Sequence, residues 1–135
     1  MKRVVAMIIA VVLVVSSVFV TQDVSAKRMT KRGVYLKAEK KISLKVTSKK
    51  IVIKGPLKYG KKLSLNQIKY KKLGKGKKTF KLSKKLKYYV SATYYSRRSK
   101  KEGESILKEE AKYSGSIYIY MFMKGKKIYK IVFAQ

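Results

Sequence analysis

The sequence predicts an α+β domain that is mostly β, a small antiparallel barrel or sheet that carries one helix. Apolar and polar side chains alternate repeatedly from Val34 onward, which is typical of half-buried strands. Residues 99–113 have the start signal and the apolar spacing of a helix. Residues 116–133 form two apolar runs around a glycine, which predicts a closing hairpin.

These elements come in the order strands, one helix, then a hairpin. A five-stranded Greek-key barrel of the oligonucleotide/oligosaccharide-binding type has its helix before its last two strands, so this order fits it. A β-grasp-like sheet fits nearly as well, and so does an open meander with the helix packed on one face. Element order separates these folds poorly, so all three stay open.

The first hairpin is predicted by its apolar pattern. Pairing Val46 with Ile51 and Leu44 with Ile53 brings four apolar side chains to one face and leaves a four-residue loop. The Gly55-Pro56 pair then ends the second strand, because proline has no backbone N–H to donate. The other predicted strands are residues 34–38, 79–83 and 86–92, and residues 57–78 are less regular, with a flexible loop at 73–78.

The helix has clear signals at both ends. Ser99 and Glu102 match a capping box, in which each side chain bonds a free backbone N–H of the first turn. Gly115 is the expected terminator, because glycine readily adopts the left-handed conformation after a helix. The expected apolar stripe comprises Gly103, Ile106, Leu107 and Ala111.

The last hairpin is predicted to turn at Gly125-Lys126, which suits a two-residue loop. The simplest register pairs Tyr120 with Ile131 on one face and Met121 with Lys130 on the other. The first of its two strands is apolar on both faces. We therefore expect that strand to be central and buried.

The N-terminus predicts a secretory signal peptide over residues 1–26. Lys2 and Arg3 precede an apolar run at 4–20, and Val24-Ser25-Ala26 is a suitable cleavage site. Cleavage leaves a basic lead-in, residues 27–33, and a single β-rich domain, residues 34–135. An uncleaved N-terminal membrane anchor is the alternative, because the apolar run is near the shortest length that spans a bilayer. With no cysteine, neither disulfides nor lipid attachment through an N-terminal Cys is expected.

Positive charge dominates the composition and is unevenly distributed. The chain has 36 Lys plus Arg against 6 Asp plus Glu, a formal net charge of +30. Residues 27–98 contain 26 of the basic residues and only one acid, Glu39, whereas the helix at 99–113 is neutral. A field polarised in this way steers polyanions more strongly than scattered charge does.

The densest basic stretch runs from Lys69 to Lys87 and is interleaved with aromatic residues. Lysines that follow phosphates and rings that stack suit single-stranded nucleic acid or sugar-phosphate polymers. Lysine lacks the planar fork of arginine, so diffuse rather than base-specific contact is expected. Phe80 and Tyr88 are expected in the core. The expected binding residues are Lys69, Tyr70, Lys71, Lys72, Lys75, Lys77, Lys78, Lys81, Lys84, Lys85, Lys87 and Tyr89.

The composition also excludes much enzyme chemistry. There is no His and no Cys, and Asp23 is the only Asp, which excludes Ser-His-Asp and Cys-His catalysis and the usual zinc sites. The helix glutamates are better explained as capping and i,i+4 partners of lysine than as a general acid and base. We therefore expect a protein that is not an enzyme, with no cofactor and no metal.

Residues 78–89 (KTFKLSKKLKYY) and the ending, a helix followed by a hairpin with a Lys-Gly-Lys turn, carry a resemblance. They resemble small lysine-rich exported proteins of Gram-positive bacteria. The resemblance implies export and a compact β-rich domain. It implies no site residue.

The leading expectation is a secreted or wall-associated protein that binds anionic polymers, either wall polymers or extracellular nucleic acid, without reading sequence. The alternative is a structural or protein-binding domain whose charge serves solubility and retention in the wall, with Tyr35, Tyr94 and Tyr95 as interface residues. A third possibility is a membrane-active protein. It is weaker, because the helix is neutral and lacks a basic amphipathic face.

Overall fold

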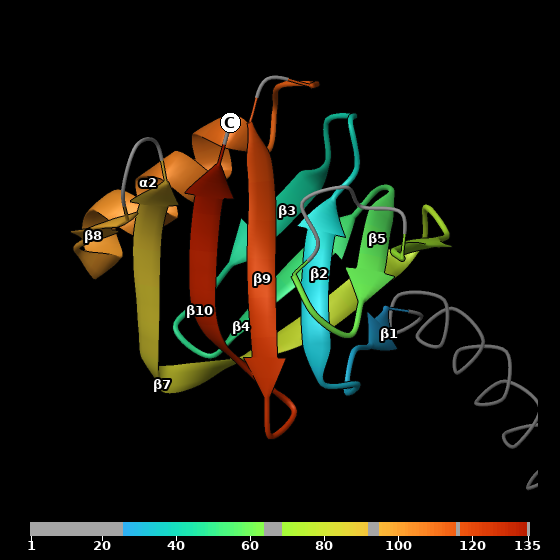
Figure 1. Ribbon diagram of the computed structural model, residues 1–135, viewed down its shortest axis with the longest axis horizontal. Helices are drawn as coiled ribbons and strands as arrows, with labels where there is room; N and C mark the ends of the chain where they lie inside the picture. The colour runs from blue at the N-terminus through green and yellow to red at the C-terminus, as the bar shows by residue number, and fades with distance from the viewer. Residues whose placement is uncertain (1–25, 64–68, 92–94, 116, 135) are drawn as a thin grey trace, which may run out of the picture.

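The computed structural model describes residues 26–63, 69–91, 95–115 and 117–134. They form one open, mixed ten-stranded sheet and one helix, which confirms the α+β, mostly β class (Figure 1). Eight strands follow the order β3-β4-β7-β10-β9-β2-β5-β6, and β1 and β8 both pair with β7. The elements are β1 (Lys27–Arg28), β2 (Gly33–Lys37), β3 (Ser43–Val46), β4 (Lys50–Lys54), β5 (Leu57–Gly60), β6 (Lys71–Leu73), β7 (Lys77–Ser91), β8 (Tyr95–Arg98), α2 (Lys100–Glu110), β9 (Tyr118–Lys124) and β10 (Lys127–Ala134).

The predicted signal peptide lies outside the described residues, apart from Ala26. Within the described residues, no helix is both long and apolar enough to cross a membrane.

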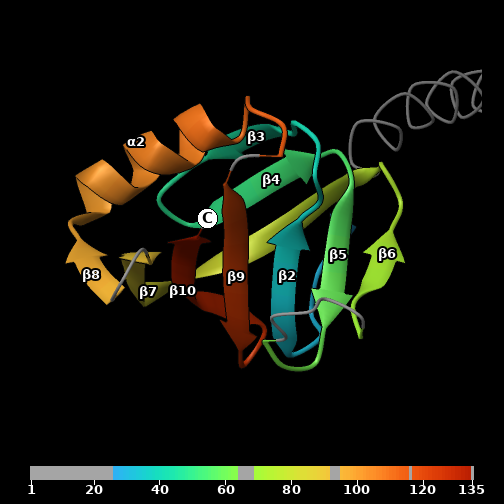
Figure 2. The same ribbon diagram turned by 45° about the horizontal axis from the view of Figure 1, so that its top comes forward.

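The sheet folds over on itself, so that α2, β3 and β4 lie behind β10, β9 and β2 (Figures 1 and 2). The space between these layers holds the main core. We call the side of the sheet that faces this core the inner face and the opposite side the outer face. Fully buried side chains of this core include Phe80, Met121 and Ile131 of the sheet and Leu107 of α2. A second buried cluster on the outer face comprises Val34, Leu36, Tyr70, Tyr120 and Val132.

Strand β7 connects the two layers and is 15 residues long. The two runs predicted as separate strands, 79–83 and 86–92, are parts of this single strand as far as Ser91, the last residue described there. Its first half pairs with β4 and its second half with β8. The two runs look separate in the sequence because the alternation is interrupted at 83–86, where the pairing with β10 skips from Leu82 to Lys87.

Two of the pairings are parallel, a feature that the expected antiparallel arrangement did not include. Strand β10 lies parallel to β7, and the two-residue strand β1 also runs parallel to β7. Parallel neighbours need a long crossover connection, and β8, α2 and β9 supply it between β7 and β10.

The register predicted for the first hairpin is confirmed. Val46 pairs with Ile51 and Leu44 with Ile53, and Ile51 and Ile53 are fully buried. Strand β4 ends directly before Gly55, as predicted.

Four short strands were not predicted: β1, β5, β6 and β8. Each has two to four residues, and all but β5 carry two basic residues. Such segments are too short to show an alternating pattern, so their pairing depends on the strands beside them.

The turn of the last hairpin is confirmed, and β9 is central, between β10 and β2. Gly125 and Lys126 both have positive φ, 61° and 68°. Positive φ at both central residues is the geometry of a type I′ turn, whose twist matches the flanking strands.

The register predicted for that hairpin is wrong beyond Ile128, because β10 has a bulge at Tyr129. Ile131 pairs with Met121 and faces the main core, while Lys130 faces outward. Without the bulge, Lys130 would pair with Met121 and its ammonium would enter the core. One extra residue therefore removes a charge from the core, and the desolvation cost of burying that charge is avoided.

Helix α2 begins after Ser99 as its N-cap, as predicted, but the Glu102 carboxylate accepts from the Ser99 hydroxyl at 3.2 Å and not from the backbone N–H that the capping box predicts. The Ser99 hydroxyl oxygen accepts a hydrogen bond from the backbone N–H of Glu102 at 3.2 Å. Gly103 lies against the ring of Tyr88, and a Cβ added there would be 2.1 Å from the Tyr88 Cγ. The helix therefore approaches β7 closely only because residue 103 has no side chain. Leu107 and Ala111 continue the buried stripe.

The predicted helix end is wrong. The helix ends at Glu110, with Ala111 as its C-cap, and Gly115 (φ 82°) lies in the turn that follows. Gly115 was expected to end the helix. Instead, the side chain of Lys37 in β2 donates hydrogen bonds to the carbonyls at the helix end. Its Nζ donates to the carbonyl of Glu110 at 2.6 Å and to the carbonyl of Tyr113.

Candidate functional site

Four exposed lysines form a row across four neighbouring strands, which we call the lysine row. Lys50 of β4 pairs with Lys81 of β7, and Lys81 also pairs with Lys127 of β10. Lys127 in turn pairs with Lys124 of β9. Paired residues point to the same side of a sheet, and neighbouring strands are about 4.8 Å apart. The four ammonium groups therefore extend from one edge of the outer face.

The lysine row has a stability cost. Like charges directly opposite each other on neighbouring strands destabilise a sheet. Lysines on edge strands are common because they prevent aggregation. That explanation does not apply here, because β7, β10 and β9 are interior strands of this sheet. An anionic ligand that lies along the row would offset the repulsion.

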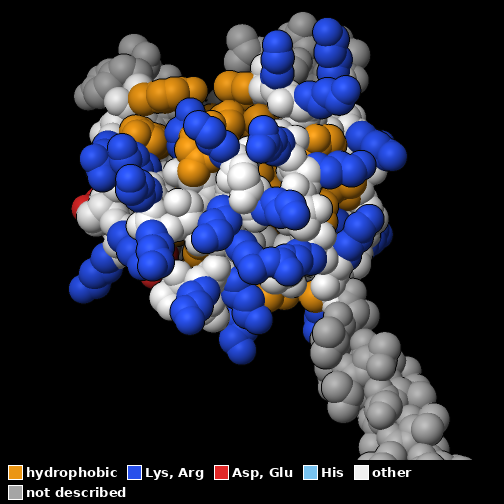
Figure 3. Space-filling view, turned by 90° about the horizontal axis from the view of Figure 1, so that it is seen from below, with side chains coloured by type: hydrophobic (Ala, Val, Ile, Leu, Met, Phe, Trp, Pro, Cys, Tyr) orange, Lys and Arg blue, Asp and Glu red, His pale blue; other side chains and the backbone are white. Residues whose placement is uncertain are grey.

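A groove of about 490 Å³ adjoins the lysine row. We call it the basic groove. The side chains that the structure describes around it include no carboxylate. Figure 3 shows the molecule from below, with Lys and Arg side chains spread over this face. The cations that line the groove are Arg28, Lys49, Lys50, Lys81, Lys84 and Lys127.

Backbone hydrogen bonds fix the elements that carry these cations. The N–H of Leu82 donates to the carbonyl of Lys49 at 2.8 Å, which holds the β3–β4 turn against β7. The N–H of Met29 donates to the carbonyl of Thr79 at 2.8 Å, which continues the pairing of β1 with β7. Helix α2, which carries four of the acids, lies at the upper left of Figure 1, whereas the β9–β10 turn beside Lys127 lies at the bottom.

The structure does not gather the predicted stretch from Lys69 to Lys87 into one patch. Lys81 and Lys84 line the basic groove, and Lys87 lies farther along the outer face, in a pocket with Arg97 and Arg98. The rest are dispersed. Lys69 and Lys71 lie beside β5, and Lys72 and Lys75 lie near Glu39. Lys77 lies beside β1, and Lys85 is exposed in the bend of β7.

Lys78 is buried and is not available to a ligand. Its Nζ donates to the carbonyls of Gly55 (3.2 Å), Gly76 (2.9 Å) and Gly74. Burial lowers the pKa of this ammonium, and the charge of nearby Lys27 lowers it further. Lys78 therefore ties the loop before β7 to the end of β4.

The tyrosines, like the lysines, range from fully buried to exposed. Tyr70, a predicted binding residue, is buried against Gly60, and Tyr35, a predicted interface residue, is fully buried. Tyr89 is half-buried on the outer face, and Tyr95 is 54% exposed. Tyr94 lies outside the described residues. Phe80 and Tyr88 are in the core, as predicted.

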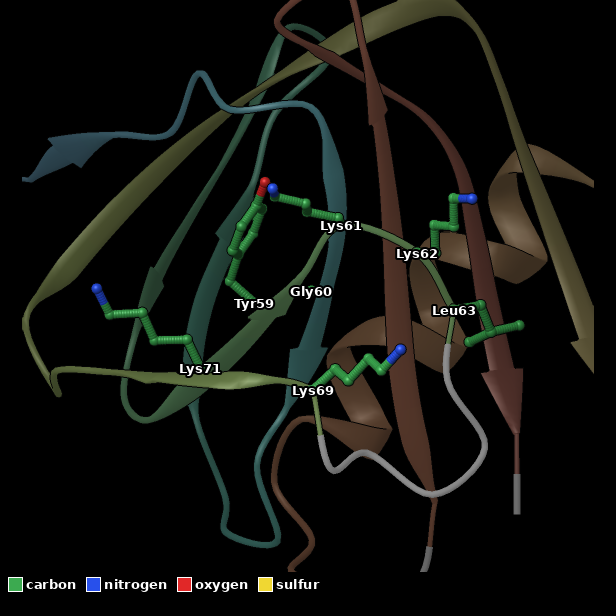
Figure 4. A pocket seen from close by; sticks show the side chains of 7 residues that line it. All are labelled: Tyr59, Gly60, Lys61, Lys62, Leu63, Lys69 and Lys71. Carbon is green, nitrogen blue, oxygen red and sulfur yellow. The ribbon is translucent and has the colours of Figure 1, made fainter.

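A larger pocket, of about 640 Å³, lies beside β5 (Figure 4). Tyr59 is at its rim and donates its hydroxyl to the carbonyl of Arg32 at 2.6 Å. The pocket contains four lysines, but Lys71 points away from Lys62 and Lys69 in Figure 4. These cations do not converge as the paired lysines of the row do, so the basic groove is the stronger candidate.

Sequence reasoning missed Arg28, Lys49, Lys50, Lys124 and Lys127. They lie outside the densest lysine stretch of the sequence, and three different strand pairings bring them near Lys81. Strand β4 brings Lys49 and Lys50, β1 brings Arg28, and β10 with β9 brings Lys127 and Lys124. One signal was available, because the predicted first hairpin already placed Lys49 and Lys50 in its turn.

Comparison with known proteins gives no family. A scan against protein-family models finds no match, and searches of the curated proteins and of the solved structures find none either. Across the described residues, no group of three or more His, Cys, Asp and Glu side chains is placed to hold a metal ion.

Proposed function

We propose that this chain is an exported, non-enzymatic protein that binds anionic polymers through the basic groove and the lysine row. The ligand is an extracellular or wall-associated polyanion, held without sequence readout. Export is supported by the N-terminal run of Lys2, Arg3 and the apolar residues 4–20.

The observation that carries this proposal is the lysine row on interior strands. Four like charges at paired positions reduce stability, and an anionic chain along the row turns that repulsion into attraction. Binding of this kind releases the counterions condensed on the polymer, so the affinity falls steeply with salt. Lysine ammonium groups act as point charges, which suits a flexible polymer without a fixed geometry.

Binding of linear polyphosphate to the purified protein tests the proposal. We call the triple variant Lys50→Gln, Lys81→Gln, Lys127→Gln the lysine-row variant. We expect it to lose about tenfold or more in affinity at low salt, which corresponds to about 1.4 kcal/mol. The matched control replaces three exposed α2-side lysines, Lys101→Gln, Lys108→Gln and Lys112→Gln, so the net charge falls equally.

The control should bind within about twofold of the wild-type protein. Equal losses in the two variants would mean that net charge alone binds the polymer, and the site would be rejected. An affinity that does not change with salt would reject the electrostatic function itself.

A further inference from the structure

Along β7 and β10, the outer face changes from lysines to aromatic rings. Beyond the lysine row, Lys87 pairs with Lys130, and Lys130 pairs with Phe122. Two residues farther along β7, Tyr89 pairs with Arg97 of β8 and with Val132 of β10. The next outward row contains Tyr95, Ser91, Ala134 and Tyr118.

Four aromatic rings of the outer face are at least partly exposed to solvent. Tyr95 is 54% exposed and Tyr129 is 38% exposed, while Tyr89 and Phe122 are half-buried. The rings lie in pairs, with centroids 6.2 Å apart for Tyr89 and Tyr95 and 6.4 Å apart for Phe122 and Tyr129. Tyr70 and the rest of the second buried cluster anchor this face at its β2 end.

Cations accompany the rings. Lys130 Nζ lies 4.4 Å from the centroid of the Phe122 ring, within the range of a cation–π contact. Arg97 is exposed beside Tyr89. At the end of the outer face away from the groove, the Tyr118 hydroxyl donates to Glu39 Oε1 at 3.0 Å. Glu39, the one acid of residues 27–98, therefore lies at the end farthest from the groove.

The basic groove and the aromatic face are continuous. Strands β7 and β10 run parallel, from Lys81 and Lys127 at the groove to Lys87 and Lys130, and then to the level of Tyr89. On β10 the step from Lys127 to Lys130 is three residues, or about 10 Å of extended chain. A linear ligand along these strands therefore meets ammonium groups first and rings next.

This order of groups discriminates between polyanions. Polyphosphates and polyol phosphates have charge but no flat face to stack on tyrosine. Duplex nucleic acid has its base faces buried in its own stack. Single-stranded nucleic acid offers both phosphates and free bases, and stacking on an aromatic side chain contributes about 1–3 kcal/mol per base.

We infer that the outer face around Tyr89, Tyr95, Phe122 and Tyr129 is a stacking platform, and that the ligand is single-stranded nucleic acid. This inference rests on the proposed function and makes it specific. The phosphate backbone lies along the basic groove and the lysine row, while the bases stack on the rings beyond them.

The test compares a twelve-residue oligothymidylate with linear polyphosphate on the same variants. Tyr95→Ala removes an exposed ring, and Tyr89→Leu removes a ring but keeps an apolar side chain in its place. We expect each to weaken oligothymidylate binding about fivefold or more, the lower end of one stacked base. Polyphosphate binding should stay within twofold. Tyr113→Ala is the matched control, because Tyr113 is 53% exposed and lies just after α2.

Tyrosine fluorescence gives a second measurement, because the chain has 11 Tyr and no Trp. Oligothymidylate should quench it and polyphosphate should not. If Tyr95→Ala and Tyr89→Leu leave oligothymidylate binding unchanged while the lysine-row variant weakens it, the platform is rejected and the proposed function stands.

Three further results would overturn the platform. One is equal weakening of polyphosphate binding by the tyrosine variants, and another is equal affinity for a duplex of the same length. The third is preferential binding of an acidic polypeptide, which would make the face a protein-binding surface. If the lysine-row variant binds both probes as well as the wild-type protein does, the proposed function fails together with the platform.

Discussion

Two groups of lysines in this chain differ in position rather than in chemistry. Lys37 and Lys78 are 1% and 5% exposed, and their ammonium groups bind backbone carbonyls. The lysines of the basic groove and the lysine row are exposed and stand beside other cations. The buried pair bonds to backbone carbonyls of the fold, whereas the paired like charges of the exposed group repel one another, and we propose that they bind an anionic ligand.

Charge density along the sequence is therefore a poor guide to which lysines share a surface. Lys77 and Lys78 are adjacent, yet only Lys77 reaches solvent. Lys81 and Lys127 are far apart in the sequence, yet they are paired. The pairing of strands decides which lysines act together.

Replacing Lys37 is the change with the largest expected effect. Lys37→Met removes the donor of the Tyr113 carbonyl and leaves the Glu110 carbonyl with only the backbone N–H of Tyr113, at 3.3 Å. An unsatisfied buried polar group costs about 1–3 kcal/mol, and the loss of a cation at the helix C-terminus adds to it. We expect the free energy of unfolding in urea to fall by about 3 kcal/mol. Lys45→Met, on an exposed position of β3, should change it by less than about 0.5 kcal/mol.

A loss below about 1 kcal/mol for Lys37→Met, no larger than one ordinary hydrogen bond, would mean that Lys37 does not hold the helix end. The two groups of lysines would then not differ as described.

Lys78→Met should have the second largest effect, a loss of about 2 kcal/mol in the free energy of unfolding. Its three carbonyl partners lie in glycines of two loops, and the freed loops can reach water more easily than a helix end can. Hydrogen exchange should therefore accelerate locally around residues 74–76. Unchanged exchange there would contradict the role of Lys78 as a tie between the loops.

The buried hydroxyl of Tyr88 is expected to reduce the stability of the fold, because it makes no hydrogen bond to the described residues. Its hydroxyl has no hydrogen-bond partner among the described residues, and burial raises its pKa to about 12, with a smaller effect from Glu104. Tyr88→Phe should stabilise the protein at neutral pH by about 1 kcal/mol, because an unpaired polar atom is removed.

The advantage of Tyr88→Phe should grow as the pH rises from 10 to 12. In that range the unfolded tyrosine ionises at its ordinary pKa of 10.0, while the folded one, whose pKa is about 12, ionises less, so the wild-type protein loses stability through Tyr88. Urea unfolding of both proteins at pH 8 and pH 11 measures this. An advantage that is constant across the two pH values would contradict the raised pKa.

The smallest expected effect on stability is that of Lys81→Gln. Removing the central charge of the lysine row relieves repulsion with Lys50 and Lys127, so stability should rise by less than about 1 kcal/mol. Thermal unfolding at low salt checks this, and the gain should vanish at high salt. A loss of stability would mean that Lys81 belongs with the buried lysines.

Much of the fold could be predicted from the sequence. The first hairpin, the helix start and the final turn each depend on neighbouring residues, such as Ser99 with Glu102 or Val46 with Ile51. The helix end could not be predicted, because its cap is Lys37, a residue distant in the sequence. The bulge at Tyr129 was missed because it is needed only once Ile131 must face the core.

The candidate site could be predicted only as a charge excess. Lys81 and Lys84 were among the predicted binding residues, but Lys127 joins them through the parallel pairing of β7 with β10, and Arg28 through that of β7 with β1. Lys49 joins them through the antiparallel pairing of β4 with β7. Parallel pairing needs a crossover, and no local pattern in the sequence indicates which strands it joins.

The most direct test of the central claim is the salt dependence of oligothymidylate binding for the wild-type protein, the lysine-row variant and the α2-side control. For single strands the slope of log affinity against log salt is about −0.7 per neutralised phosphate, so the lysine-row variant should lose about 2 from the slope. The control, with the same net charge, should keep the wild-type slope. Equal slopes for the lysine-row variant and the wild-type protein, or equal losses in both variants, would contradict a defined polyanion site on the outer face.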